Sequence, residues 1–355
     1  MAKVARCGRC GVPKRVGKEQ RWLDNGVIRH AKDPDIRMIF YESENLDNLF
    51  RGVGEIIGLP IEHIVIESKR RDVKEYTERT VPGIARKLVR RIGFGVVARQ
   101  LSNLGLAYGF GAVSLGESRR NFDDDDYQVM YIRNPHSIAF FTGEVLGAWE
   151  AIDGRESCAV YERTGEDSFK VTCSIGRHPL ELSERLQHRH HLYKPGDVKL
   201  ELCPSCGVPS KVAEYRWDLE EGTITHPRTG RRMTIISPTG IDALLADLEA
   251  ELGEEIPAAV VEAQRRFARE FMADRDWETG LAGMREMLAL RGLGYLSRME
   301  ADEEGLRVTI RNSCMPLLMV GTVQGLYELV SGKERSEYRW RESSDGDLEI
   351  EITPA

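Results

Sequence analysis

Apolar residues recur at helical spacing in two separate stretches of the chain. In each stretch they occupy positions i, i+3, i+4, i+7 and i+11, the spacing that places side chains on one face of an α-helix. The first set comprises Leu46, Leu49, Phe50, Val53 and Ile57, and the second comprises Ile241, Leu244, Leu245, Leu248 and Leu252. The pattern predicts two amphipathic helices, each with one face packed against a core.

Near the end of each half of the chain, apolar and polar residues alternate instead. The alternating apolar positions are Phe169, Val171, Cys173 and Ile175 in the first half and Leu348, Ile350 and Ile352 in the second. This period of two predicts half-buried β-strands. Ahead of these strands, residues 135–149 and 313–327 are apolar with glycines four residues apart. We expect each of these two segments to form a buried helix in close contact with a neighbour.

The two halves also share a seven-residue motif that contains two cysteines. Cys7-Gly-Arg-Cys10-Gly-Val-Pro recurs as Cys203-Pro-Ser-Cys206-Gly-Val-Pro, 196 residues later (203 − 7). Both copies are followed by Arg-Trp and then by Gly-x-Ile-x-His. Similarity that continues at a nearly fixed spacing predicts a tandem duplication of one structural unit.

A chain of 355 residues is longer than most single cores, so the duplication predicts two domains of α+β class. Each domain is expected to begin with a knuckle hairpin that carries the cysteine motif and to continue as an α+β unit. The boundaries are 1–196 for repeat 1 (hairpin 1–42, α+β unit 43–196) and 197–355 for repeat 2 (hairpin 197–237, α+β unit 238–355).

The four motif cysteines are candidates for a single metal site. Together Cys7, Cys10, Cys203 and Cys206 are the ligand set of a closed tetrahedral zinc site or a rubredoxin-like iron site. Such a shared site requires the two repeats to face each other across a pseudo-two-fold axis. Zinc is favoured over iron because a structural role needs no electron partner. Two separate sites, each completed by other ligands, are the alternative.

Composition restricts the setting and the partners of the chain. The formal net charge is −7, which disfavours a general affinity for nucleic acid. No apolar run reaches the roughly 18–20 residues that span a bilayer, so no membrane partner is expected. Seven cysteines, four of them at metal-type spacing, suit a reducing compartment better than a disulfide framework. The cytoplasm is therefore the expected location.

Several of these features together resemble the 4-vinyl reductase domain family. They are the helix at residues 46–57 that ends at Gly58, a second helix through residues 67–76, and a strand–helix–strand unit marked by Ile132-Arg133-Asn134-Pro135, Gly143, Gly147, Gly154 and the strand at 169–175. The resemblance implies a hydrocarbon-binding α+β fold that is shared with subunits of trafficking complexes and that dimerises. The cysteine motifs then look like zinc-ribbon or rubredoxin-like knuckles appended to such domains.

Repeat 1 carries the candidate ligand pocket. The glycine-rich residues 93–116 and the acidic run 123–126 are expected to form an insertion that repeat 2 lacks, and the glycine-rich part brings aromatic side chains. Pockets for small ligands are mostly apolar, with a few polar groups. An apolar molecule is therefore predicted to contact Phe94, Tyr108, Phe110, His136, Phe140 and Phe141.

The sequence as a whole favours a metal-stapled protein that binds or senses an apolar small molecule. The sequence contains no grouped or repeated set of a nucleophile with a base, or of a histidine with a carboxylate, that would predict catalysis. No catalytic residue is therefore assigned, and an enzyme is disfavoured. Two alternatives remain. One is an enzyme or redox accessory with a four-thiolate iron site, and the other is a zinc ribbon that docks nucleic acid or a protein.

Overall fold

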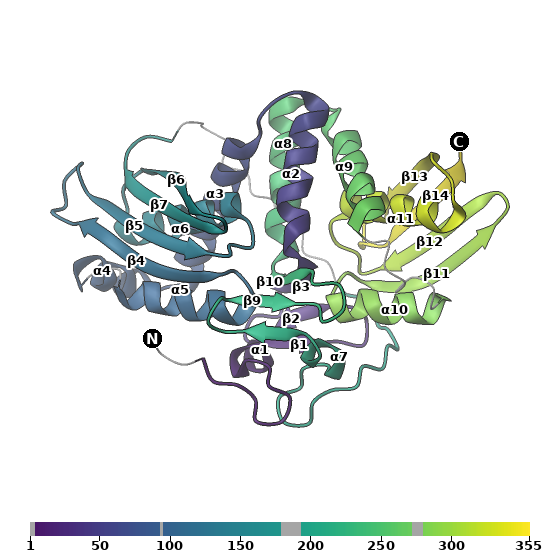
Figure 1. Cartoon of the computed structure of the whole chain (residues 1–355), viewed down its shortest axis with the longest axis horizontal. Helices are drawn as coiled ribbons and strands as arrows, with labels where there is room; N and C mark the ends of the chain where they lie inside the picture. The colour runs from purple at the N-terminus through teal and green to yellow at the C-terminus, as the bar shows by residue number, and fades with distance from the viewer. Residues whose placement is uncertain (1–3, 93–94, 179–192, 272–279) are drawn as a thin grey trace.

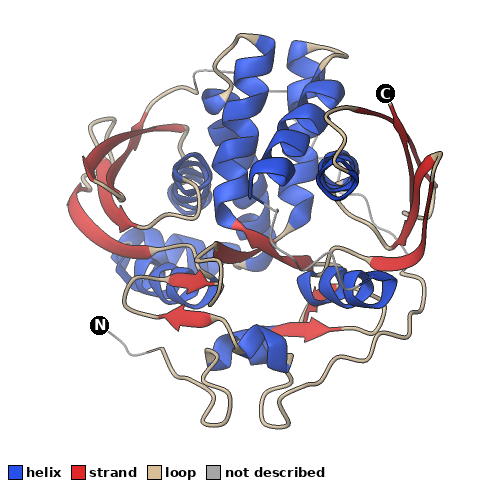
Figure 2. Ribbon diagram, turned by 45° about the vertical axis from the view of Figure 1, so that its right-hand side comes forward, coloured by secondary structure: helices blue, strands red, loops and turns tan. Residues whose placement is uncertain are grey.

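Three antiparallel sheets and a central group of helices make up the fold (Figure 1). The computed structural model describes residues 4–92, 95–178, 193–271 and 280–355. A six-stranded sheet lies beneath the central helices, and one four-stranded sheet lies on either side of them, as Figure 2 also shows. The fold is thus a mixed arrangement of helices and antiparallel sheets.

The two halves of the chain contribute elements of the same types in nearly the same order. The first half contains α1 (Lys14–Glu19), β1 (Gln20–Trp22), β2 (Ile28–His30), β3 (Arg37–Glu42), α2 (Ser43–Ile57), α3 (Glu62–Thr80), α4 (Gly83–Ile92), α5 (Gly95–Tyr108), β4 (Ala112–Arg119), β5 (Tyr127–Arg133), α6 (Ile138–Asp153), β6 (Ser157–Gly165) and β7 (Ser168–Ile175). The second half contains α7 (Ser210–Ala213), β8 (Arg216–Asp218), β9 (Thr223–Thr225), β10 (Arg232–Ile236), α8 (Pro238–Leu252), α9 (Ile256–Phe271), α10 (Gly280–Arg291), β11 (Tyr295–Asp302), β12 (Gly305–Arg311), α11 (Pro316–Ser331), β13 (Ser336–Glu342) and β14 (Leu348–Pro354).

The predicted insertion is wrong in its main part. Helix α10 and strand β11 follow α9 just as α5 and β4 occur after α3, so the glycine-rich segment does have a counterpart. The two stretches share little besides their glycines, since Tyr108-Gly-Phe-Gly stands where the second half has Arg291-Gly-Leu-Gly. Among the residues that the structure describes, the helix without a counterpart is α4.

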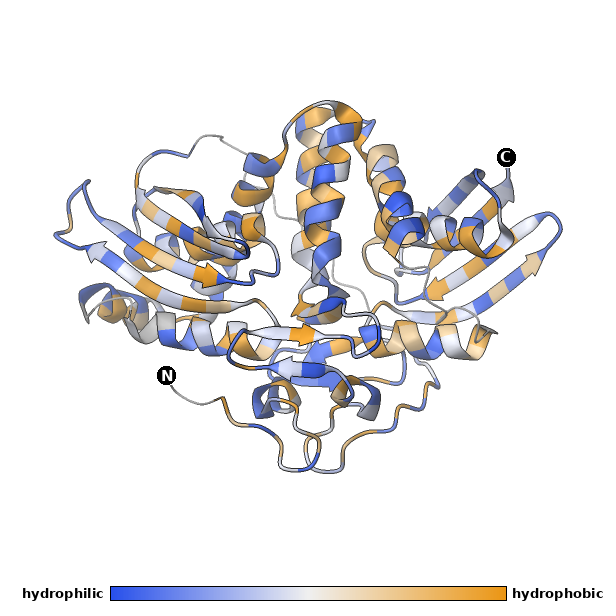
Figure 3. Cartoon of the chain, viewed as in Figure 1, coloured by the Kyte–Doolittle hydropathy of each residue, from blue (hydrophilic) through white to orange (hydrophobic). Residues whose placement is uncertain are grey.

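The two predicted amphipathic helices are confirmed as α2 and α8. Their predicted apolar positions are buried, apart from the half-buried residues Ile57 and Leu252 at their ends. Polar residues occupy the remaining face, which gives both helices the alternating colours of Figure 3. Helix α2 ends at Gly58 in the left-handed conformation (φ 73°), as the resemblance to a helix–glycine unit led us to expect.

The central sheet joins one ribbon hairpin from each half. Its strand order is β1-β2-β3-β10-β9-β8, and the junction is the antiparallel pair β3–β10, in which Ile39 lies opposite Ile236. All six residues of β3 are buried because the sheet is covered on both faces. Ile39 and Tyr41 face the core of the central helices, whereas Met38 and Phe40 face the core around the hairpins.

We call α3–α6 with β4–β7 the outer unit of the first half, and α9–α11 with β11–β14 the outer unit of the second half. Each hairpin packs against the outer unit of the opposite half. The N–H of Gly294 donates to the carbonyl of Gly26, and the N–H of Gly111 donates to the carbonyl of Gly222, both at 3.0 Å. A side chain at Gly26 would overlap the backbone of Gly294, so only glycine fits this contact. The long helices cross in the same manner, since α2 packs against α9 and α8 packs against α3. The two halves are therefore interlocked.

Within each outer unit, two helices approach closely at glycines, as the spacing of four predicted. Gly147 of α6 lies directly against the carbonyl of Arg70 on α3, and the Arg70 guanidinium donates to Glu150, at 2.6 Å. The second half repeats this arrangement with Gly325, Arg265 and Glu328. The absence of a Cβ lets the backbones meet, and the buried ion pair then fixes their alignment.

The apolar cores of the two outer units differ in their connection to the centre. In the second half, residues of the outer sheet such as Leu296 and Ile310 belong to the same continuous core as the central helices. In the first half, the residues between α6 and the outer sheet, such as Met130 and Val171, form a separate core. The first half therefore contains a break in its apolar packing that the second half lacks.

Candidate functional site

Each cysteine motif folds into a knuckle closed by its own backbone. The N–H of Cys7 donates to the carbonyl of Val12 at 2.8 Å, and the N–H of Cys203 donates to the carbonyl of Val208 at 2.8 Å. Isolated bridges, Arg6 to Pro13 and Leu202 to Pro209, close the base of each loop. This fold turns both cysteines of a knuckle to the same side of the loop.

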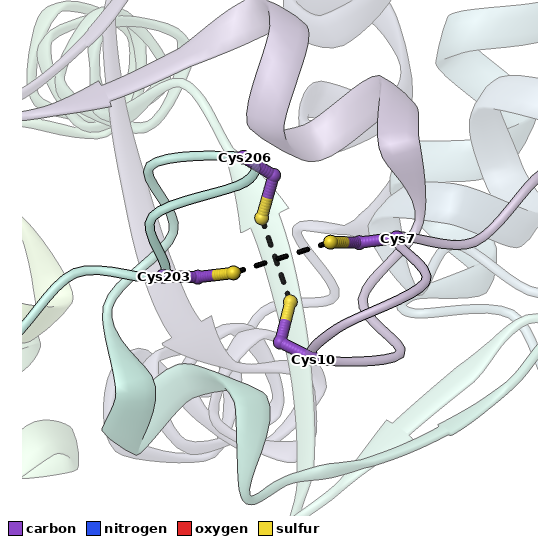
Figure 4. Close-up of side chains that lie close together, drawn as sticks. All are labelled: Cys7, Cys10, Cys203 and Cys206. Carbon is purple, nitrogen blue, oxygen red and sulfur yellow. Dashed lines mark hydrogen bonds between the residues drawn. The ribbon is translucent and has the colours of Figure 1, made fainter.

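The four cysteine sulfurs converge on one point (Figure 4). All four sulfurs lie within 4.8 Å of one another, with 4.0 Å from Cys7 to Cys203 and 3.4 Å from Cys10 to Cys206. Metal–sulfur bonds of about 2.3 Å in a tetrahedron place the sulfurs about 3.8 Å apart. The prediction that these cysteines come close enough to bind one metal ion is confirmed.

The surroundings of the four thiols shift their pKa values in opposite directions. Backbone N–H groups of Cys10 and Arg9 lower the pKa of Cys7 to about 6, and those of Ser205 and Cys206 lower the pKa of Cys203. Burial raises the pKa of Cys10 and raises that of Cys206 to about 12. A bound cation would offset this burial, because metal coordination favours the thiolate.

Two separate metal sites are not what the structure shows. Among the described residues, the four-cysteine cluster is the one group of three or more histidine, cysteine or carboxylate side chains that lie close enough to hold a metal ion. The histidines that follow each knuckle make local contacts instead. Nδ1 of His30 accepts from the N–H of Lys32, and Nδ1 of His226 accepts from the N–H of Thr229.

A cavity of about 380 Å³ lies between the first hairpin, α3, α5 and the start of α8. Helix α1 belongs to both sites. At Gly17 it lies against the second knuckle, where an added Cβ would be 2.8 Å from the Cβ of Cys206. Two residues later, Glu19 lines the cavity and accepts a hydrogen bond of 2.6 Å from the hydroxyl of Tyr108. The position of the second knuckle therefore supports one wall of the cavity.

The predicted ligand-contacting residues are only partly brought together. Tyr108 and Phe110 line the cavity, and the ring of His136 stacks behind Phe110 with centroids 4.6 Å apart. Phe140 packs in the central core against Phe50, with centroids 5.4 Å apart. Phe141 lies on the other side of α6, in the separate core beneath the outer sheet. Phe94 lies outside the described residues.

The charged residues of the cavity were missed from the sequence. Lys69 donates to Asp72 at 2.8 Å, and its Nζ lies 3.8 Å from Glu144. Burial opposes the charge on Lys69, but the two carboxylates outweigh it, and the pKa of Lys69 is raised. One signal was available. Glu144 is an acidic residue inside the apolar, glycine-spaced segment that forms α6, and burying a charge there is unfavourable unless it has a partner.

The corresponding place in the second half is nearly filled. It holds about 20 Å³, room for about one water molecule, and is lined by Met287, Arg291, Leu293 and Thr322 among others. Arg291 forms a buried ion pair with Glu42 there. Counted from the shared glycines, Arg291 stands at the position of Tyr108 and Thr322 at that of Glu144.

A second hollow of about 610 Å³ lies at the outer end of α2 and the start of α3 and α6. Its wall includes Phe50, Ile61 and Val65, with Asp47 and Glu62 among the polar residues. None of the six predicted ligand-contacting residues is among those that line it.

Comparison of the sequence with protein-family models finds no match, and comparison with curated proteins finds none either. Among the helices of the described residues, none combines the length and the apolar character needed to cross a membrane.

Proposed function

We propose that the chain is a metal-stapled small-molecule-binding protein, in which one zinc ion joins two repeats and the first repeat holds the ligand. The observation that carries this proposal is the convergence of four sulfurs from two knuckles that lie 196 residues apart in the chain. A closed set of four thiolates is typical of structural zinc sites, because it leaves no ligand position for chemistry. Iron would fit the same sulfurs and would colour the protein red.

The proposal includes a tandem duplication with a pseudo-two-fold arrangement of the repeats. Its support is the reciprocity of the contacts. Gly26 meets Gly294 as Gly222 meets Gly111, and the central sheet has equivalent strands on either side of the β3–β10 pair. A gene that fused two copies of a dimerising domain would produce such an arrangement. Dimerisation is also what the resemblance to the 4-vinyl reductase family implies, and we retain that family as the proposed relative.

The partner in this proposal is a small molecule with an apolar part. The cavity of about 380 Å³ falls in the range of ligand pockets, and two of the predicted aromatic residues line it. We propose no membrane or nucleic-acid partner. Thiolates that bind a metal need a reducing compartment, which favours the cytoplasm.

Metal analysis tests the staple. Protein purified without added metal should contain one zinc ion per chain, as measured by elemental analysis with inductively coupled plasma mass spectrometry. Cys7→Ser or Cys203→Ser should lower the zinc content to a small fraction. Cys158→Ser is the matched control, since Cys158 is a half-buried cysteine outside the cluster and should keep the full content. Fresh protein without a stoichiometric transition metal would refute the proposal, and a red protein with one iron would replace zinc by iron.

A further inference from the structure

The lining of the cavity beside α1 includes apolar side chains from both halves of the chain. These side chains come from β3 and its preceding turn, from α3, from α5 and the turn after it, and from β10. They are Ile36, Met38, Val73, Leu104, Phe110 and Ile236. A ring-sized apolar body placed against these side chains would leave water, which favours binding.

The lining also contains a carboxylate, that of Glu144, which pairs with Lys69 by charge but accepts no hydrogen bond from its neighbours. Glu144 Oε1 lies 3.8 Å from Lys69 Nζ and 3.6 Å from His136 Nε2, both beyond hydrogen-bond distance. The Glu144 side chain is 20% exposed, and Glu144 lines the cavity. A donor that enters the cavity can therefore reach it.

His136 supplies an independent sign of an incomplete polar site. It is 2% exposed, and neither of its ring nitrogens has a hydrogen-bond partner. Buried polar atoms are nearly always paired in proteins, so the His136 ring nitrogens leave a place next to Glu144 for a polar partner, either a water molecule or a ligand group.

The charge around the cavity selects for a cation. Five lining residues are acidic and three are basic, histidine aside: Glu19, Asp35, Asp72, Glu75 and Glu144 against Arg15, Lys69 and Arg79. The lining therefore has a negative balance of two charges (5 − 3). The rings of Tyr76, Tyr108 and Phe110 add surfaces that attract positive charge. An anionic ligand would meet repulsion in this setting.

We infer that this cavity binds a small organic amine, with the protonated amino group at Glu144 and an apolar, ring-sized body against Leu104 and Phe110. The inference rests on the proposed small-molecule function and assigns the chemical class of the ligand. The second half cannot bind in the same way, because Thr322 stands in the place of Glu144 and the space there is about 20 Å³.

Three probes of equal size and different charge test this assignment. Benzylamine is a cation at neutral pH, benzyl alcohol is neutral, and benzoate is an anion. Each is titrated into the full-length, metal-loaded protein and followed by calorimetry. Benzylamine should bind at least about tenfold more tightly than benzyl alcohol, since a hydrogen bond to a charged group contributes about 1.5–3 kcal/mol. Benzoate should show no binding.

Variants locate the site. Glu144→Gln keeps the shape of the side chain and should reduce benzylamine affinity about tenfold, while benzyl alcohol affinity stays within about twofold. Leu104→Phe should fill the cavity and weaken both ligands. Thr322→Ala is the matched control at the corresponding place of the second half and should leave all affinities unchanged. Thermal unfolding verifies that each variant is folded, and the near-isosteric Glu144→Gln variant keeps the test valid if Leu104→Phe misfolds.

The outcomes separate the two proposals. Equal affinity for the three probes, or a benzylamine affinity that Glu144→Gln does not change, overturns the amine assignment and leaves a metal-stapled binding protein. Binding that survives Leu104→Phe but is lost in Leu59→Arg would move the ligand to the outer hollow and also overturn it. Absence of any binding at millimolar probe concentration refutes the site, whereas absence of metal refutes the staple independently.

Discussion

The two outer units share most of their elements, yet among the described residues the first lines a cavity of about 380 Å³ beside the central sheet, whereas the corresponding place in the second holds about 20 Å³. In the second unit, Arg291 of α10 forms a buried ion pair with Glu42 at the end of β3 from the first half, and Thr322 and Met319 also line the small space that remains. In the first unit, Glu144 and Lys69 face about 380 Å³ of open space, and the apolar core is divided. A repeated framework can thus keep one copy closed for stability while the other exposes polar groups to a ligand.

Breaking the ion pair in the second unit should have the largest effect on stability. Arg291→Met leaves the carboxylate of Glu42 buried without its charged partner, which should lower the free energy of unfolding by about 3–5 kcal/mol. Urea denaturation followed by circular dichroism measures the change. The double variant Arg291→Met with Glu42→Gln should recover part of the loss, because it removes the uncompensated charge. A loss below about 1 kcal/mol would show that this pair does not hold the second unit closed.

Substitution of the glycines at the helix contacts should destabilise both units equally, although the two units differ in their cavities. An added Cβ at Gly325 would lie 2.6 Å from the carbonyl of Arg265, and Gly147 is at least as crowded against Arg70. Gly147→Ala and Gly325→Ala should each cost about 1–3 kcal/mol through overpacking, measured by urea denaturation. Gly83→Ala is the control, since the nearest atom to its added Cβ is the end of the flexible Arg86 side chain. Unequal costs for Gly147 and Gly325 would weaken the equivalence of the two units.

The smallest effect is expected at the cavity wall of the first unit. Tyr108→Phe removes the hydroxyl that donates to Glu19 and accepts from Gln20, each at 2.6 Å. Burial and the adjacent Glu19 carboxylate raise the pKa of Tyr108, so the native residue is a neutral donor at physiological pH. The loss should be about 1 kcal/mol in chemical denaturation. A loss as large as that of Arg291→Met would contradict the idea that the first unit gives up stability here for binding.

Local pattern predicted much of the fold and little of the contact map. The period of the apolar residues identified α2, α8, β7 and β14, because burial of one face imposes that period whatever the partner is. It could not show that α2 packs against α9 of the other half, since any apolar surface of similar width would satisfy the same face. The counterpart of α5 was missed because the two helices share little sequence, and the glycines of the turns that follow them (Gly109 and Gly111, Gly292 and Gly294) are what the two stretches have in common.

The candidate metal site was predictable to the residue, whereas the cavity was not. Four thiols at a repeated Cys-x-x-Cys spacing have few other uses in a reducing compartment, so the sequence alone indicated their convergence. The cavity depends on positions at which the two halves carry different side chains. Lys69 and Glu144 are ordinary surface residue types on helices, and they come together only because α3 packs against α6, a contact that no local pattern records.

The separation of the two knuckles also sets an order of events during synthesis. Cys203 leaves the ribosome 196 residues after Cys7, which at 5–20 residues per second corresponds to about 10–40 s. Throughout that interval the first hairpin has neither its metal partners nor Leu290, the residue whose carbonyl accepts from Trp22. The two thiols of the first knuckle and the β3 edge that pairs with β10 therefore stay without their partners until the second hairpin has been made, so a metal site that all four cysteines share can form only after Cys206 has emerged.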